Sequence, residues 1–387
     1  MTVPVHSVVA SVVSPLQSVL AAIPDPDPIP LPAPTELLTF LLVVTFLLHL
    51  VPMNYVLGGS LLMVLSYARA RRAAGETARH HRRLIEVLTR AFPATIAFTI
   101  TLGVAPLLFV QVLYGPLFFT SSILMAWPWL GVIGLLLLGY YAAYWHAYQH
   151  TRLGVAASWV ALAVALAFLV IAFLFVNNFG LLQNPEVWRP LYLSDRRGLH
   201  LYAIWDGSVF PRYLHFVFAA LALTGLAVAG VAAGRGGREP EFSRWGMGYG
   251  ARWFIGATLL QMGSGIWFVA RQPARIRNAL LGASPQDTLL LAVAVGCALV
   301  AMGVLVPSDR ISARRLYLAS AAIGVTVILM AVLRQRIRTM WLDPYFRTEQ
   351  LSVASQWGAI LLFLILFLAG VLLVGWMVRE FFREGRS

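Results

Sequence analysis

The sequence predicts an all-α, polytopic membrane bundle of nine transmembrane helices, and three observations support this prediction. The 387 residues are 59% hydrophobic and only 12% charged, which is about half the charged fraction of an ordinary soluble domain. The mean hydropathy is +0.77. Nine apolar runs reach the ~20 residues that a helix needs to cross a bilayer, and they lack the alternation of transmembrane β-strands.

Each apolar run is expected to be helical because backbone groups in lipid must be hydrogen-bonded within the protein. The expected spans are 36–66, 91–113, 119–145, 154–176, 210–233, 250–270, 286–306, 315–333 and 353–378. Residues 36–387 are therefore expected to form one nine-helix domain. Residues 1–35 are expected to be a tail and Pro-rich linker on the periplasmic side, because prolines interrupt them at Pro15 and from Pro24 to Pro28.

Arginine supplies all 29 basic residues and lies mainly between the spans. This distribution indicates membrane topology rather than a nucleic-acid surface, so no nucleic acid is expected as a partner. The densest group, from Arg69 to Arg90, is expected in the cytoplasm, which puts the N-terminus outside and the C-terminus inside. We therefore expect a multi-pass protein of the bacterial inner membrane, with the lipid bilayer as its surroundings.

Several arginines would nevertheless remain on the outer side, and they are candidates for anion binding. They are Arg189, Arg196, Arg197, Arg212, Arg271, Arg275, Arg277, Arg334, Arg336, Arg338 and Arg347. Haem propionates, an anionic substrate or an acidic protein surface would each suit them, and solvation by lipid headgroups is the alternative. Arg212, Arg271 and Arg334 are the predicted cofactor-binding members.

Two histidines lie where an ionisable group is costly and therefore marks a candidate functional site. His49 falls within the first span and His215 near the start of the fifth. Neutral imidazole is a common axial ligand of haem iron, and hydrogen-bonded packing is the alternative for both. His146 and His150 could hold a metal or a haem edge, although the tyrosines before them favour an interfacial aromatic belt. His80 and His81 are expected to be solvated.

The single cysteine, Cys297, limits the redox chemistry of the chain. It excludes an internal disulfide, and there is no Cys-x-x-Cys-His motif for covalent haem c. An iron–sulfur cluster held by this chain alone is excluded as well.

Several motifs, taken in order, resemble subunit I of the cytochrome bd quinol oxidases. They are His49 followed by Val51-Pro52 and Gly58-Gly59, the segments 98–104 and 111–115, the run Asn177-Asn178-Phe179-Gly180 with Gln183-Asn184-Pro185, His215 at the fifth helix, and Arg334-Gln335-Arg336 before the last span. The resemblance runs from about residue 40 to the end. It implies a nine-helix fold, a haem ligated by His49 at the oxygen site and a low-spin haem b ligated by His215.

The chain departs from that family at four places. The third span, from Ser121 to Tyr148, contains no Asp or Glu, whereas the family carries its oxygen-site carboxylates there. Ala331 occupies the expected position of a haem-ligating glutamate. The methionine partner of the low-spin haem is absent from the seventh span, which leaves Met262 as a candidate substitute. The connection between spans six and seven is too short for the family's quinol-binding loop.

These features favour a haem b-binding electron-transfer subunit of a respiratory oxidoreductase complex. It would bind one or two b haems through the iron ligands His215 and His49, with no haem d expected and no catalytic residue assigned. Its partners would be a second membrane subunit and a periplasmic cytochrome c or other redox protein. In one form of this hypothesis the second subunit has a related fold, and in another form quinone is a partner as well. The alternatives are a divergent bd-type terminal oxidase, taking electrons from cytochrome c or quinol to oxygen, and a haem-free structural anchor.

Overall fold

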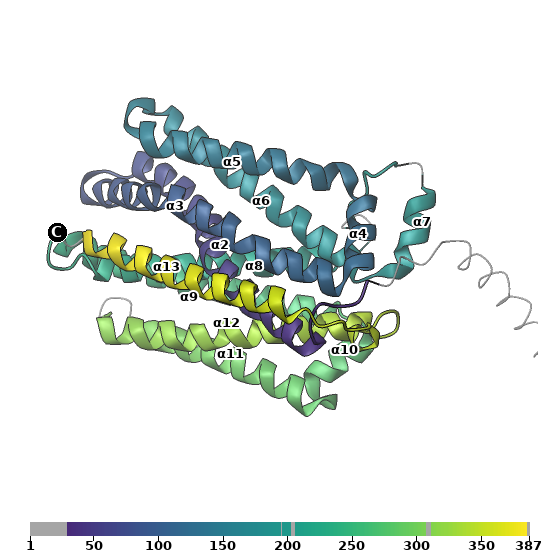
Figure 1. Ribbon diagram of the computed structural model, residues 1–387. Helices are drawn as coiled ribbons and strands as arrows, with labels where there is room; N and C mark the ends of the chain where they lie inside the picture. Colours follow the sequence, from purple (N-terminus) through teal and green to yellow (C-terminus); the bar gives the residue numbers. More distant parts are fainter. Residues whose placement is uncertain (1–28, 195, 203–205, 307–310, 385–387) are drawn as a thin grey trace, which may run out of the picture. The chain divides into compact units, whose positions relative to one another are not determined.

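The computed structural model describes residues 29–194, 196–202, 206–306 and 311–384 (Figure 1). These residues contain twelve α-helices, and their only β-pairing is an isolated parallel bridge between Leu31 and Val353. Residues 1–28 of the expected tail lie outside the described ranges. The structure therefore confirms the all-α class for the part of the chain that it describes.

Nine of the described helices are long and apolar enough to cross a membrane, which confirms the predicted number of spans. The third span begins at Ala126 rather than at 119, because the helix is interrupted at Met125. They are α2 (Thr35–Arg72), α3 (Gly75–Leu113), α5 (Ala126–Leu153), α6 (Ala156–Leu182), α8 (Val209–Ala233), α9 (Pro240–Ala270), α11 (Pro285–Leu305), α12 (Ala313–Leu342) and α13 (Trp357–Glu384). Shorter helices are α4 (Gly115–Leu124), α7 (Trp188–Leu193) and α10 (Ala274–Asn278). The protein is a multi-pass membrane protein.

Several helices extend well beyond the apolar runs that predicted them. Helix α3 begins at Gly75 rather than near residue 91, α9 begins at Pro240 rather than near 250, and α12 continues to Leu342. The added turns are rich in Arg and Glu, which are good helix formers and can keep their charged ends in water. As a result, Arg334, the residue expected in a connection, lies on a helix instead.

The chain divides into two compact units. The first joins Met1–Thr35 to Thr348–Ser387. In it, the amide of Leu31 donates to the carbonyl of Ser352 at 2.7 Å, and the amide of Ala354 donates to the carbonyl of Leu31 at 2.9 Å. The segment before α2 is thus hydrogen-bonded to the segment before α13. The second unit, Glu36–Arg347, contains both candidate histidines and all the predicted arginines.

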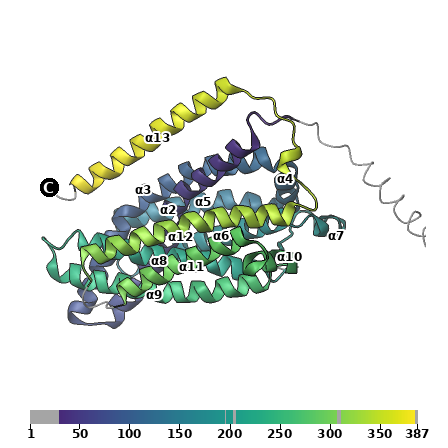
Figure 2. The ribbon, with the colours of Figure 1, turned by 90° about the horizontal axis from the view of Figure 1, so that it is seen from below.

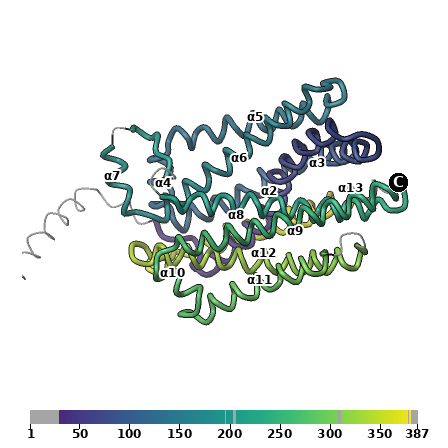
Figure 3. Tube along the Cα trace, turned by 180° about the vertical axis from the view of Figure 1, so that it is seen from behind, coloured from purple at the N-terminus to yellow at the C-terminus, as the bar shows by residue number. Residues whose placement is uncertain are grey.

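In the second unit the long helices pair as hairpins, α5 with α6, α8 with α9 and α11 with α12 (Figures 2 and 3). Helices α4, α7 and α10 lie together at one end of these hairpins, which we call the α7 end (Figure 1). Close backbone contact holds the α8–α9 pair. A Cβ atom on Gly250 would lie 2.4 Å from the carbonyl oxygen of Gly225 and 2.6 Å from the amide nitrogen of Ala229. Only glycine fits there.

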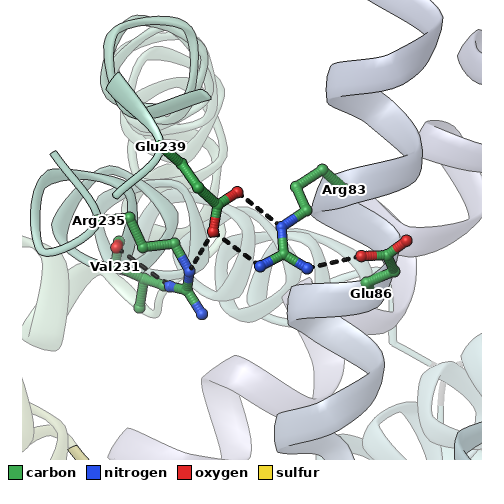
Figure 4. A network of polar contacts seen from close by, with 5 residues as sticks. All are labelled: Arg83, Glu86, Val231, Arg235 and Glu239. Atoms are coloured by element: carbon green, nitrogen blue, oxygen red, sulfur yellow. Dashed lines mark hydrogen bonds and ion pairs between the residues drawn. The ribbon is translucent and has the colours of Figure 1, made fainter. Parts of the chain in front are cut away.

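At the opposite end, Glu239 joins the α8–α9 turn to α3 (Figure 4). Its two carboxylate oxygens accept from Nε and Nη2 of Arg83, both at 2.8 Å. Arg83 also donates to Glu86 at 2.6 Å, and Arg235 lies 3.8 Å from Glu239. The hydrogen bonds from Arg83 hold the pKa of Glu239 below its usual value.

We expect Glu239→Gln to lower stability at pH 7 by about 1 kcal/mol, the upper end of the range for a pair in contact with water. Because the folded-state pKa of Glu239 is lowered, its contribution is present above the unfolded carboxyl pKa of about 4.3 and is lost as the pH falls through the folded value. Thermal unfolding of both proteins in detergent at several pH values measures this. A stability difference that persists unchanged at pH 3 contradicts the assignment.

Candidate functional site

The imidazole of His215, on α8, lies against one turn of α9. Its Nδ1 is 3.1 Å from the backbone carbonyl oxygen of Gln261, and its Nε2 is 3.4 Å from the side-chain amide nitrogen of the same residue. A Cβ atom on Gly265 would approach the ring to 3.2 Å. A carbonyl oxygen can only accept, so Nδ1 carries the proton and Nε2 presents a lone pair.

His49, on α2, makes two of these contacts with a turn of α3. Its Nδ1 is 2.9 Å from the carbonyl oxygen of Thr99, and a Cβ atom on Gly103 would lie 2.8 Å from its Cε1. In both sites the imidazole donates to the carbonyl of one residue and packs over a glycine four residues later. The two histidines therefore share one tautomer and one kind of cradle, although they come from different helix pairs.

This arrangement suits an axial ligand of haem iron. A ligating histidine usually donates its second ring nitrogen to a carbonyl or carboxylate, which fixes the tautomer and the ring orientation. Both histidines meet that requirement through backbone carbonyls. The described residues hold no group of three or more His, Cys, Asp or Glu side chains suited to a bare metal ion. Haem iron needs only one or two protein ligands, so the donor set fits haem better than a metal ion alone.

Three arginines gather near the α7 end, and these are Arg212 on α8 and Arg334 and Arg338 on α12. They interact electrostatically with one another. Each guanidinium lies over an aromatic ring: Arg334 is 4.3 Å from the ring centre of Phe46, and Arg212 is 5.4 Å from that of Phe268. Cation–π contacts partly replace the hydration that these cations lose.

The arginine group lies close to both histidines along the helices. Phe46 precedes His49 by three residues on α2, and Arg212 precedes His215 by three residues on α8. Three residues are nearly one helical turn, about 4.5 Å along the axis. Both imidazoles therefore have a guanidinium about one turn nearer the α7 end, where the carboxylates of a ligand could meet it.

The predicted Arg271 lies apart from this group. It caps α9, and its Nη2 would be 3.3 Å from a Cβ atom on Gly207. The carboxylate of Asp206, next in sequence, accepts from the hydroxyl of Tyr202 at 2.6 Å and from the amide of Ser208 at 2.7 Å. Burial and this carboxylate raise the pKa of Tyr202. The connection between α7 and α8 thus brings one acidic group beside the arginines.

The remaining sequence-predicted residues lie in packed surroundings. Met262 packs against the apolar cluster that contains Met302, and its role as a haem ligand stays a prediction. His146 is buried, and its Nε2 is 2.9 Å from the hydroxyl of Tyr67.

The expectation that His80 and His81 are solvated is wrong. Both are buried, since His80 stacks on Trp245 at 5.2 Å and His81 meets the same ring edge-on at 5.0 Å. The early start of α3 places them against α9, and their aromatic neighbours cover them.

A buried pair of hydroxyl and amide side chains joins α4 to α6. The hydroxyl of Ser121 is 3.3 Å from the side-chain oxygen of Asn178, and the amide of Asn178 donates to Ser122 at 3.3 Å. Ser121 and Asn178 are fully buried, and Ala331 is buried as well. These neutral groups satisfy one another but do not ionise at physiological pH.

No family model matches the chain, and no curated protein sequence matches it. Among solved structures, a bd oxidase from Geobacillus thermodenitrificans superposes with a TM-score of 0.70 at 16% identity, over 88% of this chain and 95% of that one. The chain has the fold of a bd oxidase. At this identity the likeness to the bd oxidase concerns the fold alone.

Sequence reasoning found the two histidines but missed their supports, and it grouped Arg338 with the other outer arginines without singling it out. The carbonyls of Thr99 and Gln261 carry no signal in the sequence, because any residue provides a carbonyl. Gly103 and Gly265 gave a weak signal as small residues within apolar helices. Arg338 could have been singled out, since it lies four residues after Arg334 and therefore on the same face of a helix.

The glycine cradles predict a graded response to added methyl groups. Gly103→Ala should cost about 1–3 kcal/mol, the usual cost of overpacking, because its Cβ atom would meet His49 at 2.8 Å. Gly265→Ala should cost less, since its contact is 3.2 Å, and Gly131→Ala on α5 should be neutral because nothing lies within 4 Å. Thermal unfolding of the three variants tests the order, and equal midpoints would refute it.

Proposed function

We propose that this protein is a haem b-binding membrane subunit of a respiratory oxidoreductase complex that transfers electrons. The observation that carries the proposal is the shared geometry of His215 and His49. Each donates Nδ1–H to a backbone carbonyl at 3.1 or 2.9 Å, which leaves Nε2 as the ring nitrogen able to bind iron. At His215 the side-chain amide of Gln261, 3.4 Å from Nε2, would have to give way to the iron. Packing alone does not require the same tautomer, carbonyl and glycine in two separate helix pairs.

His215 and His49 would hold the iron of one b haem each, and Arg212 and Arg334 would face the propionates. Arg271, farther along α9, would meet a more peripheral anionic group. A bound b haem supplies a reversible one-electron carrier. The surrounding helices keep water from the imidazoles, and the arginine group favours negative charge near the α7 end. The sixth ligand of the iron at His215 is left open, with Met262 as the predicted candidate.

The electron donor and acceptor follow from the expected topology. If the α7 end faces the periplasm, its exposed arginines, among them Arg271 and Arg275, suit an acidic redox protein such as a cytochrome c. The other partner would be quinone or a second membrane subunit. A bacterial inner-membrane location belongs to the same proposal.

A second candidate is a divergent bd-type terminal oxidase, and the fold favours it. That function needs protons delivered to oxygen within the membrane, usually through ionisable groups. The buried pair of Ser121 and Asn178 ionises under no physiological condition, so an oxidase would need another route. Binding of carbon monoxide to a high-spin haem would favour the oxidase over the electron-transfer subunit.

Single histidine variants test the proposal. His215→Ala should remove one equivalent of low-spin haem b per chain, and His49→Ala should remove a second where two are present, because each loses its iron ligand. His150→Ala serves as the control, since His150 lies at the end of α5 away from both cradles. Haem content per chain and reduced-minus-oxidised spectra are measured on protein that elutes as the intact complex.

Unchanged haem in both His215→Ala and His49→Ala would contradict this assignment and return both imidazoles to a packing role. A wild-type complex that assembles without any haem would instead favour the structural anchor.

A further inference from the structure

Arg338 is the largest fully buried side chain in the described part of the molecule, with 1% of its surface exposed. It lies on α12, and its guanidinium carbon is 5.3 Å from the ring centre of Tyr114 and 5.7 Å from that of Phe179. Helices α12, α6 and the end of α3 therefore enclose it. An arginine so deeply buried in a membrane protein normally has an anionic or carbonyl partner.

Two neighbours fix the guanidinium on one side only. Nη1 of Arg338 donates to the side-chain oxygen of Gln335 at 2.9 Å, and the amide of Gln335 donates to the hydroxyl of Tyr114 at 2.8 Å. Nε and Nη2 of Arg338 are buried and have no hydrogen-bond partner within the described residues. The side chain is thus held in place while its other two donor nitrogens stay free.

The two free nitrogens form one particular edge of the guanidinium. Nε–H and the nearer N–H of Nη2 point the same way and match the two oxygens of a carboxylate. Leaving them unpaired in a buried site carries a large desolvation cost. No described Asp or Glu forms a salt bridge with Arg338, whereas its helix neighbour Arg336 pairs with Asp287.

We propose that the Nε and Nη2 edge of Arg338 binds the carboxylate of a buried ligand, with Gln335 and Tyr114 as positioning residues. The ligand chemistry is a carboxylate on a group that enters between α3, α6 and α12. Its source is either a haem propionate, in which case the inference rests on the proposed function, or a free carboxylic acid. The proximity of Arg334, one turn earlier and stacked on Phe46 beside His49, favours the propionate.

The test begins with the sign of a stability change, which does not depend on haem. Arg338→Met removes the charge and keeps most of the volume. If a carboxylate is bound, the variant loses it and the thermal midpoint of the purified complex falls. If Arg338 is unpaired, the variant removes a buried unpaired charge and the midpoint rises.

Two further variants test whether Arg338 binds a carboxylate. Arg338→Lys keeps the charge but not the two-pronged edge, so it should fall between wild type and Arg338→Met; it also replaces Arg338→Met if that variant does not fold. Arg336→Met is the matched control on the same helix. It should lower the midpoint by unpairing Asp287, with no change in bound ligand.

Redox titration and native mass spectrometry then identify the source of the carboxylate. For a propionate, Arg338→Met should lower the reduction potential of the haem and make it depend on pH between 6 and 8, because the propionate then takes up a proton as the iron takes up an electron. For a free acid, the potential stays unchanged, or wild type has no haem, and native mass spectrometry shows a bound acid that Arg338→Met loses. The result for a free acid supports the carboxylate site at Arg338. An absence of haem in the wild-type protein contradicts the proposed function but not this site.

Two outcomes overturn the inference. One is a midpoint for Arg338→Met that equals or exceeds that of wild type. The other is a lowered midpoint with neither an altered haem potential nor a lost acid, which would reduce Arg338 to a packing residue.

Discussion

A hydrocarbon interior offers no water to a polar group, and the architecture of this chain follows from that constraint. Backbone amides are satisfied within helices. Imidazoles at membrane depth are satisfied by carbonyls of the neighbouring helix, as His49 is by Thr99 at 2.9 Å. Such contacts require the two helices to keep a fixed register. Glycines such as Gly103 leave room for the imidazole ring against the neighbouring helix. Hydrogen bonds from the two imidazoles thus link α2 to α3 and α8 to α9.

Two kinds of partner stabilise the arginines of the second unit. Carboxylates neutralise some of them, as Glu239 and Glu86 do for Arg83. The buried Arg334 and Arg338 lie over aromatic rings instead. Rings lower the cost of burying a cation without cancelling its charge. The ion pairs of Arg83 connect helices to one another, while the ring contacts of Arg334 and Arg338 leave positive charge available to a ligand.

The fold was largely predictable, because hydropathy reports how much of each helix can lie in lipid. It could not report where the helices end, and α3 and α12 continue through arginine-rich turns that hydropathy assigns to connections. The burial of His81 follows from that extension and was missed with it. Among site residues, His215 and His49 were predictable as ionisable groups in apolar runs. Their carbonyl partners depend on the register between neighbouring helices, and this register cannot be predicted from a single sequence.

The protein shares its fold with a bd oxidase, and its buried polar groups near Ser121 are neutral. Neutral Ser121 and Asn178 are hydrogen-bonded to each other, and His49 and His215 each donate to a backbone carbonyl. The proposed function connects these observations, because haem held by the histidines would carry electrons without needing ionisable groups near Ser121.

The most direct test of this account is a dithionite-reduced minus oxidised spectrum of the purified wild-type complex, with the extracted haem quantified by type. The account predicts low-spin haem b, at one or two equivalents per chain, without haem d. A well-folded preparation that contains no haem would contradict it.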